Sequence, residues 1–446
     1  MILPTLTRRS FLRRSTAAAA ALSFPTVVRS ANPNSNLQIV AVGCSGKGLS
    51  DISETGSHPK AKFVAFCDVD TERFREADKK FPGTPHYQDW REMFAKLSDT
   101  FDAVTVSTPD HWHAPVVMAA MKLHKHVYCQ KPLAHTVWEV RQMRRQAEIS
   151  KVITQMGNQI HSHEAYRTGV KLIRDGVIGK IKAVHSWQPN PGNKYSGLSK
   201  RPAPSGAMVP ASLNWDLWIG PAPMRPYEPD MYHPFKWRDW QDFGSGTMGD
   251  FGCHILDPVF TALELTAPLT VRAENSGTNE ETWPAAETVS YIFPGTKWTA
   301  DKTLPLTWYD GGRFPDHALT QMPEDAKLPG GGSLFIGEGG TMILPHVKGP
   351  SLYPVETFAD FQIETVAGSS HYHALVDGAI AGTQTTDGFH YAGPLSEAVQ
   401  LGNVATRVPG QLLEWDAEKL LVKNSEAATK LLTKAYREGW KLDAAS

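Results

Sequence analysis

The sequence has little cysteine, and its charges almost cancel. Four cysteines are spread over 446 residues, and no C-x-x-C pair occurs among them, so their spacing favours neither a zinc site nor a disulfide framework. We expect Cys44, Cys67, Cys129 and Cys253 to be small buried residues. The 45 Lys and Arg residues balance 46 Asp and Glu residues, and no basic stripe follows the N-terminal segment, which argues against a nucleic-acid partner.

The sequence also lacks an apolar run long enough to span a bilayer. The apolar run from Thr16 to Phe24 is too short for this. It follows the twin-arginine pattern Thr7-Arg8-Arg9-Ser10-Phe11-Leu12-Arg13 and precedes the small residues Ser30-Ala31, an order that resembles a Tat export signal. An amphipathic N-terminal arm is the alternative. We therefore expect residues 1–31 to be a signal and the protein to be periplasmic or otherwise exported through the Tat pathway, which carries folded proteins.

The composition is that of a globular protein, with 41% hydrophobic and 20% charged residues, and the length suits two or three domains. Predicted strands and helices alternate from residue 37 onward, which favours parallel strands in a doubly wound sheet. The expected strands are 37–42, 62–67, 103–106, 126–129 and 152–156, and the expected helices are 71–80, 90–97, 115–123 and 136–149. The sequence therefore predicts an α/β fold in which residues 32–158 form a Rossmann domain.

The alternation ends near Gln159. A helix at 163–175 and a strand at 181–187 are followed by a Pro-, Gly- and Trp-rich stretch, 189–246, whose weak periodicity favours a functional loop or lid. Its aromatic residues could stack on sugar rings or pack the lid against the core. They are Trp215, Trp218, Tyr227, Tyr232, Trp237 and Trp240. We expect residues 159–446 to form an α+β domain with a large, mainly antiparallel sheet. Its expected strands are 288–293, 296–300, 303–309 and 333–336, and its later helices are 371–381, 393–407 and 427–438.

A glycine-rich turn follows the first predicted strand and opens a helix. In the segment 43–48, Gly43 and Gly48 stand at the first and last positions of the G-x-G-x-x-G fingerprint of dinucleotide-binding folds, and Ser45 replaces the middle glycine. Serine is small enough to let the backbone approach a pyrophosphate, and the helix N-terminus offers free N–H groups to the phosphates. Alternatively, these glycines serve only a tight turn.

Asp68 ends the second predicted strand, about twenty residues after the glycine-rich turn, where an acid accepts hydrogen bonds from the adenosine ribose. A 2′-phosphate would meet a like charge there. The sequence therefore favours NAD over NADP, although Arg73 lies close enough in sequence to soften the rejection of the phosphate. The alternative is that Asp68 only caps a helix.

Two further segments carry groups for acid–base chemistry. Lys131 directly follows a strand, and ligands bind at the carboxyl edge of a doubly wound sheet. Asp250 and His254, in the Gly-rich segment 244–254, are four residues apart and share one face of a helix. Such an acid and histidine can orient a hydroxyl and exchange its proton. A solvated lysine and a histidine satisfied within its helix are the alternatives.

Together these segments resemble the Gfo/Idh/MocA family, the group of glucose-fructose oxidoreductase and inositol dehydrogenase. The resemblance covers nearly the whole chain after the signal. It rests on the glycine-rich turn, Thr108-Pro109-Asp110-His111-Trp112-His113, Lys131-Pro132, Met156-Gly157-Asn158-Gln159, and the Asp250/His254 segment that continues to Asp257-Pro258. Members mostly have Glu-Lys-Pro where this chain has Gln130-Lys131-Pro132, so a carboxylate beside the lysine is missing. The family's open second sheet often forms an interface, so a homo-oligomer, dimer or tetramer, is expected.

The resemblance also implies roles for individual residues. A secondary alcohol would give hydride to the nicotinamide, while Lys131 and His254 take or relay the hydroxyl proton, and Asp250 binds a second hydroxyl or orients His254. No metal is expected, because His111 and His113 stand two apart in a Pro-bounded turn without a third ligand nearby. The expected cofactor contacts are Gly43, Ser45, Gly46, Gly48, Asp68, Ser107, Thr108, Pro109, His113, Gln130, Lys131 and Gln159. The expected substrate contacts are Lys131, His161, Trp240, Asp250 and His254.

We therefore expect an oxidoreductase that acts on a secondary hydroxyl of a sugar, polyol or glycoside. Its NAD would be tightly bound, because no free nicotinamide pool is expected outside the cytoplasm. Two alternatives stay open. In a redox-neutral glycosidase, transient oxidation to a 3-keto sugar acidifies the adjacent C–H, the aglycone leaves, water adds and the ketone is reduced again. In a non-catalytic sugar-binding protein, the cofactor site is vestigial, as Ser45 and Gln130 would allow.

Overall fold

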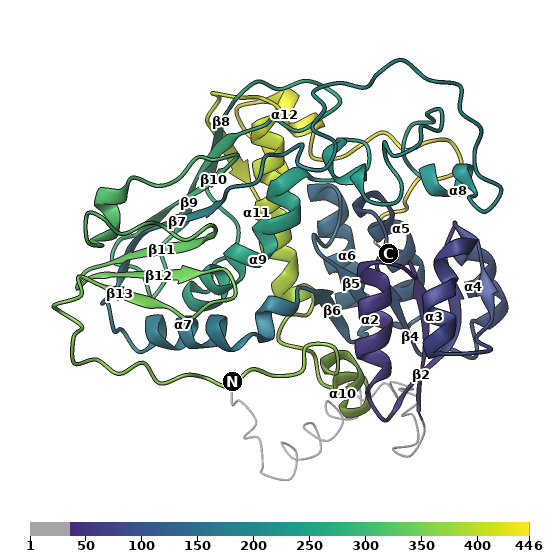
Figure 1. Cartoon of the computed structure of the whole chain (residues 1–446), viewed down its shortest axis with the longest axis horizontal. Helices are drawn as coiled ribbons and strands as arrows, with labels where there is room; N and C mark the ends of the chain where they lie inside the picture. Colours follow the sequence, from purple (N-terminus) through teal and green to yellow (C-terminus); the bar gives the residue numbers. More distant parts are fainter. Residues whose placement is uncertain (1–35, 446) are drawn as a thin grey trace, which may run out of the picture. The chain divides into compact units, whose positions relative to one another are not determined.

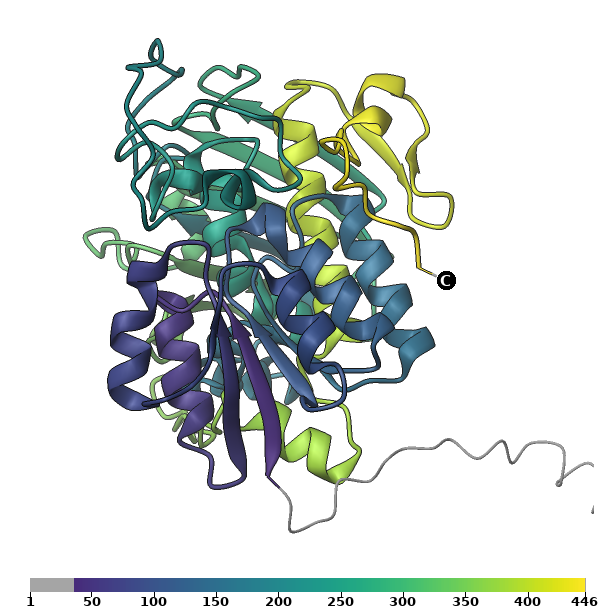
Figure 2. The same ribbon diagram turned by 90° about the vertical axis from the view of Figure 1, so that its right-hand side faces the viewer.

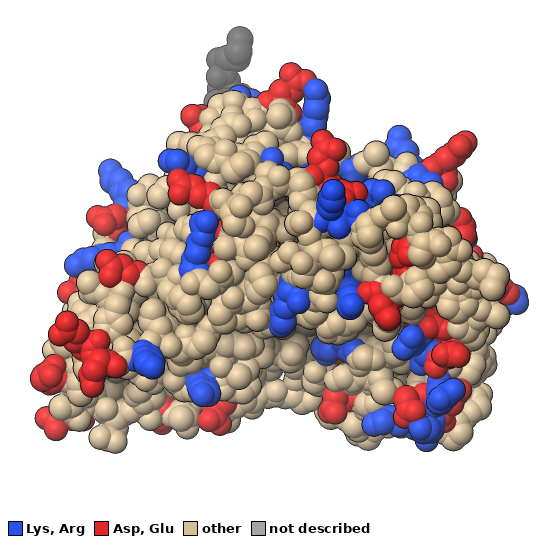
Figure 3. Space-filling model, turned by 45° about the horizontal axis from the view of Figure 1, so that its top comes forward, with Lys and Arg blue, Asp and Glu red and all other residues tan. Residues whose placement is uncertain are grey.

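The computed structural model describes residues 36–445, and the predicted export signal lies outside the described residues. The described part contains two sheets, with long helices between them (Figure 1). None of its helices is both long and apolar enough to cross a membrane. On the face drawn in Figure 3, acidic and basic side chains are interspersed.

The first sheet has six parallel strands in the order β3-β2-β1-β4-β5-β6. Their bounds are β1 Leu37–Val42, β2 Ala61–Cys67, β3 His86–Tyr87, β4 Ala103–Val106, β5 His126–Gln130 and β6 Thr154–Gly157. Its helices, which flank both faces of the sheet (Figure 2), are α2 Lys47–Gly56, η1 Thr71–Phe74, α3 Arg75–Lys80, α4 Trp90–Leu97, α5 Asp110–Lys122 and α6 Val137–Ser150. Covered on both faces, the strands are apolar runs, as a parallel sheet requires. The predicted Rossmann fold is confirmed.

Helix α5 begins at Asp110, earlier than the predicted start at Pro115. The prediction that His111 and His113 lie in a turn was therefore wrong. Pro115 is tolerated inside the helix because the carbonyl that its missing N–H would have bonded, that of His111, accepts a hydrogen bond from Lys434 Nζ at 3.4 Å.

The second sheet has nine strands in the order β13-β12-β11-β7-β10-β9-β8-β14-β15. Only the β7–β10 pair among these described strands is parallel, so the predicted, mainly antiparallel sheet is confirmed. The strands are β7 Ile181–Gln188, β8 Thr270–Asn275, β9 Glu287–Pro294, β10 Thr303–Asp310, β11 Gly332–Gly337, β12 Thr341–Pro345, β13 Ser351–Tyr353, β14 Leu413–Asp416 and β15 Leu421–Val422. The remaining helices are η2 Gln159–Ser162, α7 Glu164–Arg174, α8 Trp215–Ile219, η3 Lys236–Asp239, α9 Gly246–Leu263, η4 His317–Thr320, α10 Ala374–Ala381, α11 Phe389–Thr406 and α12 Glu426–Lys430.

Two predicted elements of the second half were wrong. Residues 296–300 form a turn instead of a strand, because the side chain of Thr299 accepts a hydrogen bond from the Thr296 amide at 2.8 Å. The helix expected at 427–438 ends at Lys430. The chain after it crosses back to α6, where Lys434 pairs with the buried Glu139 at 2.8 Å.

Helices α9 and α11 lie between the two sheets and pack against each other (Figure 1). Helix α10 returns to the first sheet, where Leu375 and Val376 join the same buried cluster as Ile39 and Phe66. The second half of the chain therefore completes the core of the first sheet, and α9 carries its N-terminus to the carboxyl edge of that sheet.

The long loop after β7, residues 189–245, reaches across to the end of β2. The Asn214 amide donates to the Val69 carbonyl at 2.8 Å, and the Thr71 amide donates to the Ser212 carbonyl at 3.0 Å. His233 Nε2 lies 3.0 Å from Asp70 Oδ2. These contacts hold the loop over the carboxyl edge of the first sheet, as expected for a lid.

Candidate active site

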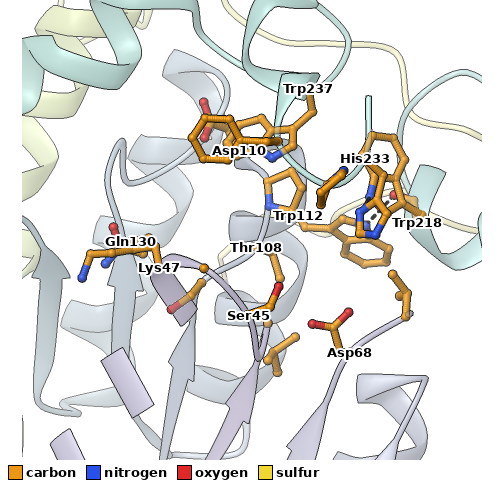
Figure 4. Close-up of a pocket in the computed structure, with 18 of the residues that line it drawn as sticks. Ser45, Lys47, Asp68, Thr108, Asp110, Trp112, Gln130, Trp218, His233 and Trp237 are labelled. Carbon is orange, nitrogen blue, oxygen red and sulfur yellow. Dashed lines mark hydrogen bonds between the residues drawn. The ribbon is translucent and has the colours of Figure 1, made fainter. Parts of the chain in front are cut away.

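A cavity of about 480 Å³ opens at the carboxyl edge of the first sheet. It lies where the strand order reverses between β1 and β4, the usual ligand position in doubly wound sheets. Its walls come from the turn after β1, the ends of β2 and β5, the start of α5, the start of α9 and the loop 189–245. Figure 4 shows Ser45, Thr108 and Asp68 below, with Trp218, His233 and Trp237 of the loop above.

Close backbone contact explains two glycines of the turn. Gly43 has a φ of +92°, and a Cβ there would lie 2.4 Å from the Ser107 carbonyl oxygen. A Cβ on Gly48 would lie 2.2 Å from the Gly43 carbonyl oxygen, so this glycine lets α2 pack against the strand. Gly46 caps α2 without a side-chain hydrogen bond, and nothing lies within 4 Å of the position of its Cβ. The N-terminus of α2 is thus open to a phosphate.

Asp68 lies on the cavity wall at the end of β2. Its carboxylate accepts hydrogen bonds from the amides of Cys44 at 2.9 Å and Asp70 at 3.1 Å. Burial raises the pKa of Asp68 to about 6, although these two amides oppose the shift. Arg73 also lies on the cavity wall, and its Nε donates to Asp70 at 2.9 Å.

Two buried oxygen atoms on the cavity wall have no hydrogen-bond partner among the described residues. They are Thr108 Oγ1 and Gln159 Oε1. A buried polar atom without a partner costs free energy, so such atoms indicate a polar ligand. Together with the open N-terminus of α2 and the Asp68 carboxylate, these two atoms form a group of polar contacts that fits a dinucleotide. We call this group the dinucleotide cradle.

Lys131 and Asp250 form a largely buried ion pair at the inner end of the cavity. Lys131 Nζ donates to Asp250 Oδ1 at 2.8 Å and also to the Asp250 carbonyl oxygen. The carboxylate that the sequence lacks at position 130 is thus supplied from α9. Because an ammonium group has three donors, one donor of Lys131 remains for a substrate.

Asp250 is held by two residues of the long loop. Tyr195 donates its hydroxyl to Asp250 Oδ2, and Arg238 Nε lies 3.4 Å from Oδ1. Burial alone would raise the pKa of Asp250, but the charges of Lys131 and Arg238 and the hydrogen bonds from Lys131 and Tyr195 hold it well below its usual range. Asp250 therefore remains a carboxylate. It does not orient His254, which was one of the two predicted roles.

His254 is oriented by Asn158. The Asn158 amide nitrogen donates to the Cys253 carbonyl at 2.9 Å and faces Asp257 Oδ1 at 3.3 Å, so its oxygen is the acceptor toward His254 Nδ1. The proton of the neutral ring therefore lies on Nδ1, and Nε2 presents a lone pair. Burial and the charge of Lys131 hold the pKa of His254 well below its usual value, which keeps the ring neutral.

The structure also explains Gln130. Its Nε2 donates to Asp51 Oδ2 at 2.9 Å, and the carboxylate of Asp51 is completely buried. Asp51 further accepts from Ser107 Oγ at 2.7 Å and pairs with Lys47. Gln130 thus lies on the cavity wall as predicted, and it donates where a glutamate could not.

Several predicted site residues lie elsewhere. His113 is buried behind the wall, where its ring bonds the Pro132 and Thr108 carbonyls, both at 2.9 Å. His161 pairs with Asp257 at 3.0 Å, away from the cavity wall. Trp240 is completely buried in the loop, where its Nε1 donates to the Met231 carbonyl at 2.9 Å. Direct contact of these three side chains with a ligand is therefore not supported.

The other predicted contacts lie on the wall of the cavity. They are Gly43, Ser45, Gly46, Asp68, Ser107, Thr108, Pro109, Gln130, Lys131, Gln159, Asp250 and His254. Gly48 lies just behind the wall. The four cysteines are free and buried, as predicted.

Among the cavity residues that sequence reasoning missed are Tyr195, Phe235, Arg238 and Asp110. The first three belong to the long loop, whose lack of periodicity hides where its side chains point. Asp110 belongs to the segment 108–113 that carries the family resemblance, and the resemblance implies no role for it. Burial raises its pKa to about 7, although the charge of Lys131 opposes the shift.

The fold and this cavity define a dinucleotide-binding protein with an acid–base site beside the dinucleotide. Residues 37–158 match a family model described as an oxidoreductase family with an NAD-binding Rossmann fold, and residues 168–295 match the model of that family's C-terminal α/β domain. The two matches together span more than half of the chain. The chain belongs to the Gfo/Idh/MocA family of oxidoreductases.

Individual relatives are more distant. A levoglucosan dehydrogenase of Pseudarthrobacter phenanthrenivorans is 28% identical over 156 residues, which are 34% of this chain and 39% of that protein. A glycosyl hydrolase family 109 protein of Shewanella sp. is 25% identical over 203 residues, which are 39% of this chain and 44% of that protein. The chain thus spans less than half the length of these relatives. A structure of levoglucosan dehydrogenase with NADH and levoglucosan, covering 85% of this chain and 99% of its own, is similar with a TM-score of 0.59 at 15% identity, which shows a common fold.

Proposed function

We propose that the protein is an NAD-dependent oxidoreductase that oxidises a secondary hydroxyl of a sugar, polyol or glycoside. The observation that carries this proposal is the Lys131–Asp250 pair at 2.8 Å, which lines the same cavity as His254 and the dinucleotide cradle. Alcohol oxidation needs a hydride acceptor, a donor to the hydroxyl oxygen and a proton acceptor close together. The cradle, Lys131 and His254 meet these needs in one cavity.

The cradle holds the dinucleotide by its phosphates and ribose. The amides at the start of α2 bind the pyrophosphate, and Asp68 accepts from the adenosine ribose. A 2′-phosphate would meet the Asp68 carboxylate, and the nearby Arg73 already donates through Nε to Asp70, so the site favours NAD over NADP. Thr108 and Gln159 supply the two polar oxygens on the wall.

When bound, NAD supplies an acceptor for the hydride of the substrate's carbinol carbon. The remaining N–H of Lys131 donates to the substrate hydroxyl oxygen and stabilises the negative charge that develops there. His254 Nε2 accepts the hydroxyl proton, since Nδ1 is occupied by Asn158. Asp250, fixed by Tyr195 and Arg238, keeps the Lys131 ammonium pointed at that oxygen.

A specific observation also favours the redox-neutral glycosidase as a second candidate. Asp110 lies on the cavity wall, and its pKa of about 7 keeps a large share of the carboxyl protonated at neutral pH. A protonated acid in this position could give a proton to a departing aglycone. The similarity to a glycosyl hydrolase family 109 protein of Shewanella sp. is consistent with this candidate.

The proposal is tested with the purified protein, NAD and a panel of sugars, polyols and glycosides, with reduced-nicotinamide absorbance and free sugar both measured. Oxidation of at least one compound supports the dehydrogenase, and release of free sugar without net reduction supports the glycosidase. Lys131→Met is expected to abolish turnover and retain NAD binding. If NAD does not bind to the wild-type protein, both enzymatic candidates are wrong and the sugar-binding alternative is favoured.

We further propose that residues 1–31 direct Tat export and that the protein is a homo-oligomer. The twin-arginine sequence Arg8-Arg9 supports the first proposal, and the family resemblance supports the second. Replacing both arginines by lysine should keep the protein in the cytoplasm, as cell fractionation would reveal. Light scattering of the purified protein would give the oligomeric state.

A further inference from the structure

The side chains on the cavity wall are more exposed at its mouth than at its inner end. At the inner end, Lys131 and His254 are largely buried. Phe235, on the wall of the same cavity, is 52% exposed. The reacting part of a substrate must therefore reach inward, while the rest of a larger substrate passes this phenyl ring.

Phe235 is held in place by the residues that hold Asp250. The Arg238 guanidinium lies 4.3 Å from the centre of the Phe235 ring, and its Nη1 donates to the Phe235 carbonyl at 3.1 Å. The Tyr195 ring meets Phe235 edge to face, with 4.8 Å between the ring centres. The aromatic surface at the mouth is thus fixed relative to the Lys131–Asp250 pair.

Its exposure sets Phe235 apart from the other large aromatic residues of the loop. The four tryptophans predicted as stacking candidates are all buried, and so is Tyr232. Packing of the loop into one apolar cluster with Phe243 accounts for their burial, although Trp218 and Trp237 also line the cavity. It does not explain an exposed phenyl ring on a cavity wall, since exposed apolar surface at a cavity is typical of ligand contacts.

We propose that Phe235, together with Tyr195 and Arg238, forms a subsite for a second ring of the substrate. The ligand class is a glycoside: its first sugar ring is oxidised at Lys131, and its aglycone or neighbouring sugar stacks on Phe235. This inference rests on the proposed oxidoreductase function and narrows its substrate class. A free monosaccharide would occupy only the inner end of the cavity and would not contact Phe235. An open-chain polyol has no flat C–H face that could stack on the phenyl ring.

The test compares substrates that share the reacting ring. For each sugar configuration in the panel, kcat/KM is measured for the free sugar, the methyl glycoside, the phenyl glycoside and the disaccharide, with wild-type protein and with Phe235→Ala. Phe361→Ala is the matched control, because Phe361 is 41% exposed and does not line the cavity. Circular dichroism establishes that each variant is folded.

For the wild-type protein we expect kcat/KM of the phenyl glycoside or disaccharide to exceed that of the free sugar by about tenfold, the usual size of one aromatic contact. Phe235→Ala should remove most of this preference, and Phe361→Ala should retain it. An equal loss for all members of a series, or an unchanged preference, would overturn the subsite.

A binding measurement separates failure of the subsite from failure of the proposed function. Phenyl glycosides and disaccharides are titrated by calorimetry into the protein loaded with NAD, with and without Phe235→Ala. Weaker binding to the variant supports the subsite even if no compound is turned over, in which case only the oxidoreductase proposal is wrong. If the wild-type protein turns over free sugars yet binds none of these two-ring compounds more tightly, the subsite is wrong and the function stands.

Discussion

Gln130 Nε2 donates to the completely buried carboxylate of Asp51 at 2.9 Å. This contact joins the end of β5 to α2 beneath the dinucleotide cradle. It accounts for a glutamine where the family mostly has glutamate, because a second carboxylate here would face Asp51 in a buried setting. The carboxylate partner of Lys131 is instead Asp250.

Gln130→Glu should destabilise the protein by about 2–4 kcal/mol, because it places two carboxyl groups in contact without water. Urea unfolding measures this change. Adding Asp51→Asn should recover part of the lost stability, because the amide introduced on α2 could donate to the carboxylate introduced on β5. The double-mutant cycle should therefore give a favourable coupling energy. Additive effects of the two substitutions would contradict the assigned contact.

Tyr195→Phe should lower kcat by about tenfold, because it removes a hydrogen bond to the charged Asp250 and loosens the Lys131 partner. The dissociation constant for NAD should stay the same. Tyr309→Phe is the control. The Tyr309 hydroxyl lies 3.0 Å from His185 Nδ1 within the second sheet and does not line the cavity. A change in NAD binding, or equal effects of both variants, would argue for a purely structural role of Tyr195.

Asn158→Asp should move the acid limb of the kcat–pH profile to higher pH. A carboxylate facing His254 Nδ1 favours the imidazolium form and so raises the His254 pKa. Because the base must be neutral to accept a proton, activity at neutral pH falls and recovers as pH rises. An unshifted acid limb would mean that His254 is not the proton acceptor.

A buried carboxyl pair in the second sheet makes stability depend on pH. Glu287 accepts from Thr406, and its amide donates to Asp310 Oδ1 at 2.9 Å. Burial raises the pKa of Glu287 to about 7, although the hydrogen bond from Thr406 opposes the shift. The folded protein therefore binds more protons than the unfolded chain between about pH 4.5 and 7, and stability falls as pH rises through this window.

Raising the pH through this window should lower the free energy of unfolding by about 1–3 kcal/mol, and Glu287→Gln should remove much of that decrease. Thermal unfolding at pH 5 and pH 8 would show a smaller difference in Tm for this variant than for the wild type. Glu356→Gln, at an exposed position, should leave the difference as it is. A larger pH dependence in Glu287→Gln would contradict the assigned protonation.

The first sheet and half of the site could be predicted because their signals are local. Alternating strands and helices, the Gly43–Gly48 turn and the acid after β2 each depend on neighbouring residues. The partners of Lys131 and His254 could be found only in the folded chain. Asp250 and Asn158 take their roles from contacts across 119 and 96 residues of sequence. Tyr195 and Phe235 lie in a segment without periodicity. The sequence around Trp240 does not distinguish a tryptophan that packs inside the loop from one that contacts a sugar.

The most direct test of the central claim is hydride transfer itself. Wild-type protein in excess over NAD is given each sugar or glycoside of the panel with deuterium on the carbinol carbon. The reaction is quenched in cold alkali, which preserves reduced nicotinamide, and the mass of the nucleotide is measured by mass spectrometry. The account predicts deuterium on the nicotinamide with the wild type and none with Lys131→Met, which is assayed at an NAD concentration that it is shown to bind. Bound NAD that acquires no deuterium from any compound of the panel would contradict it.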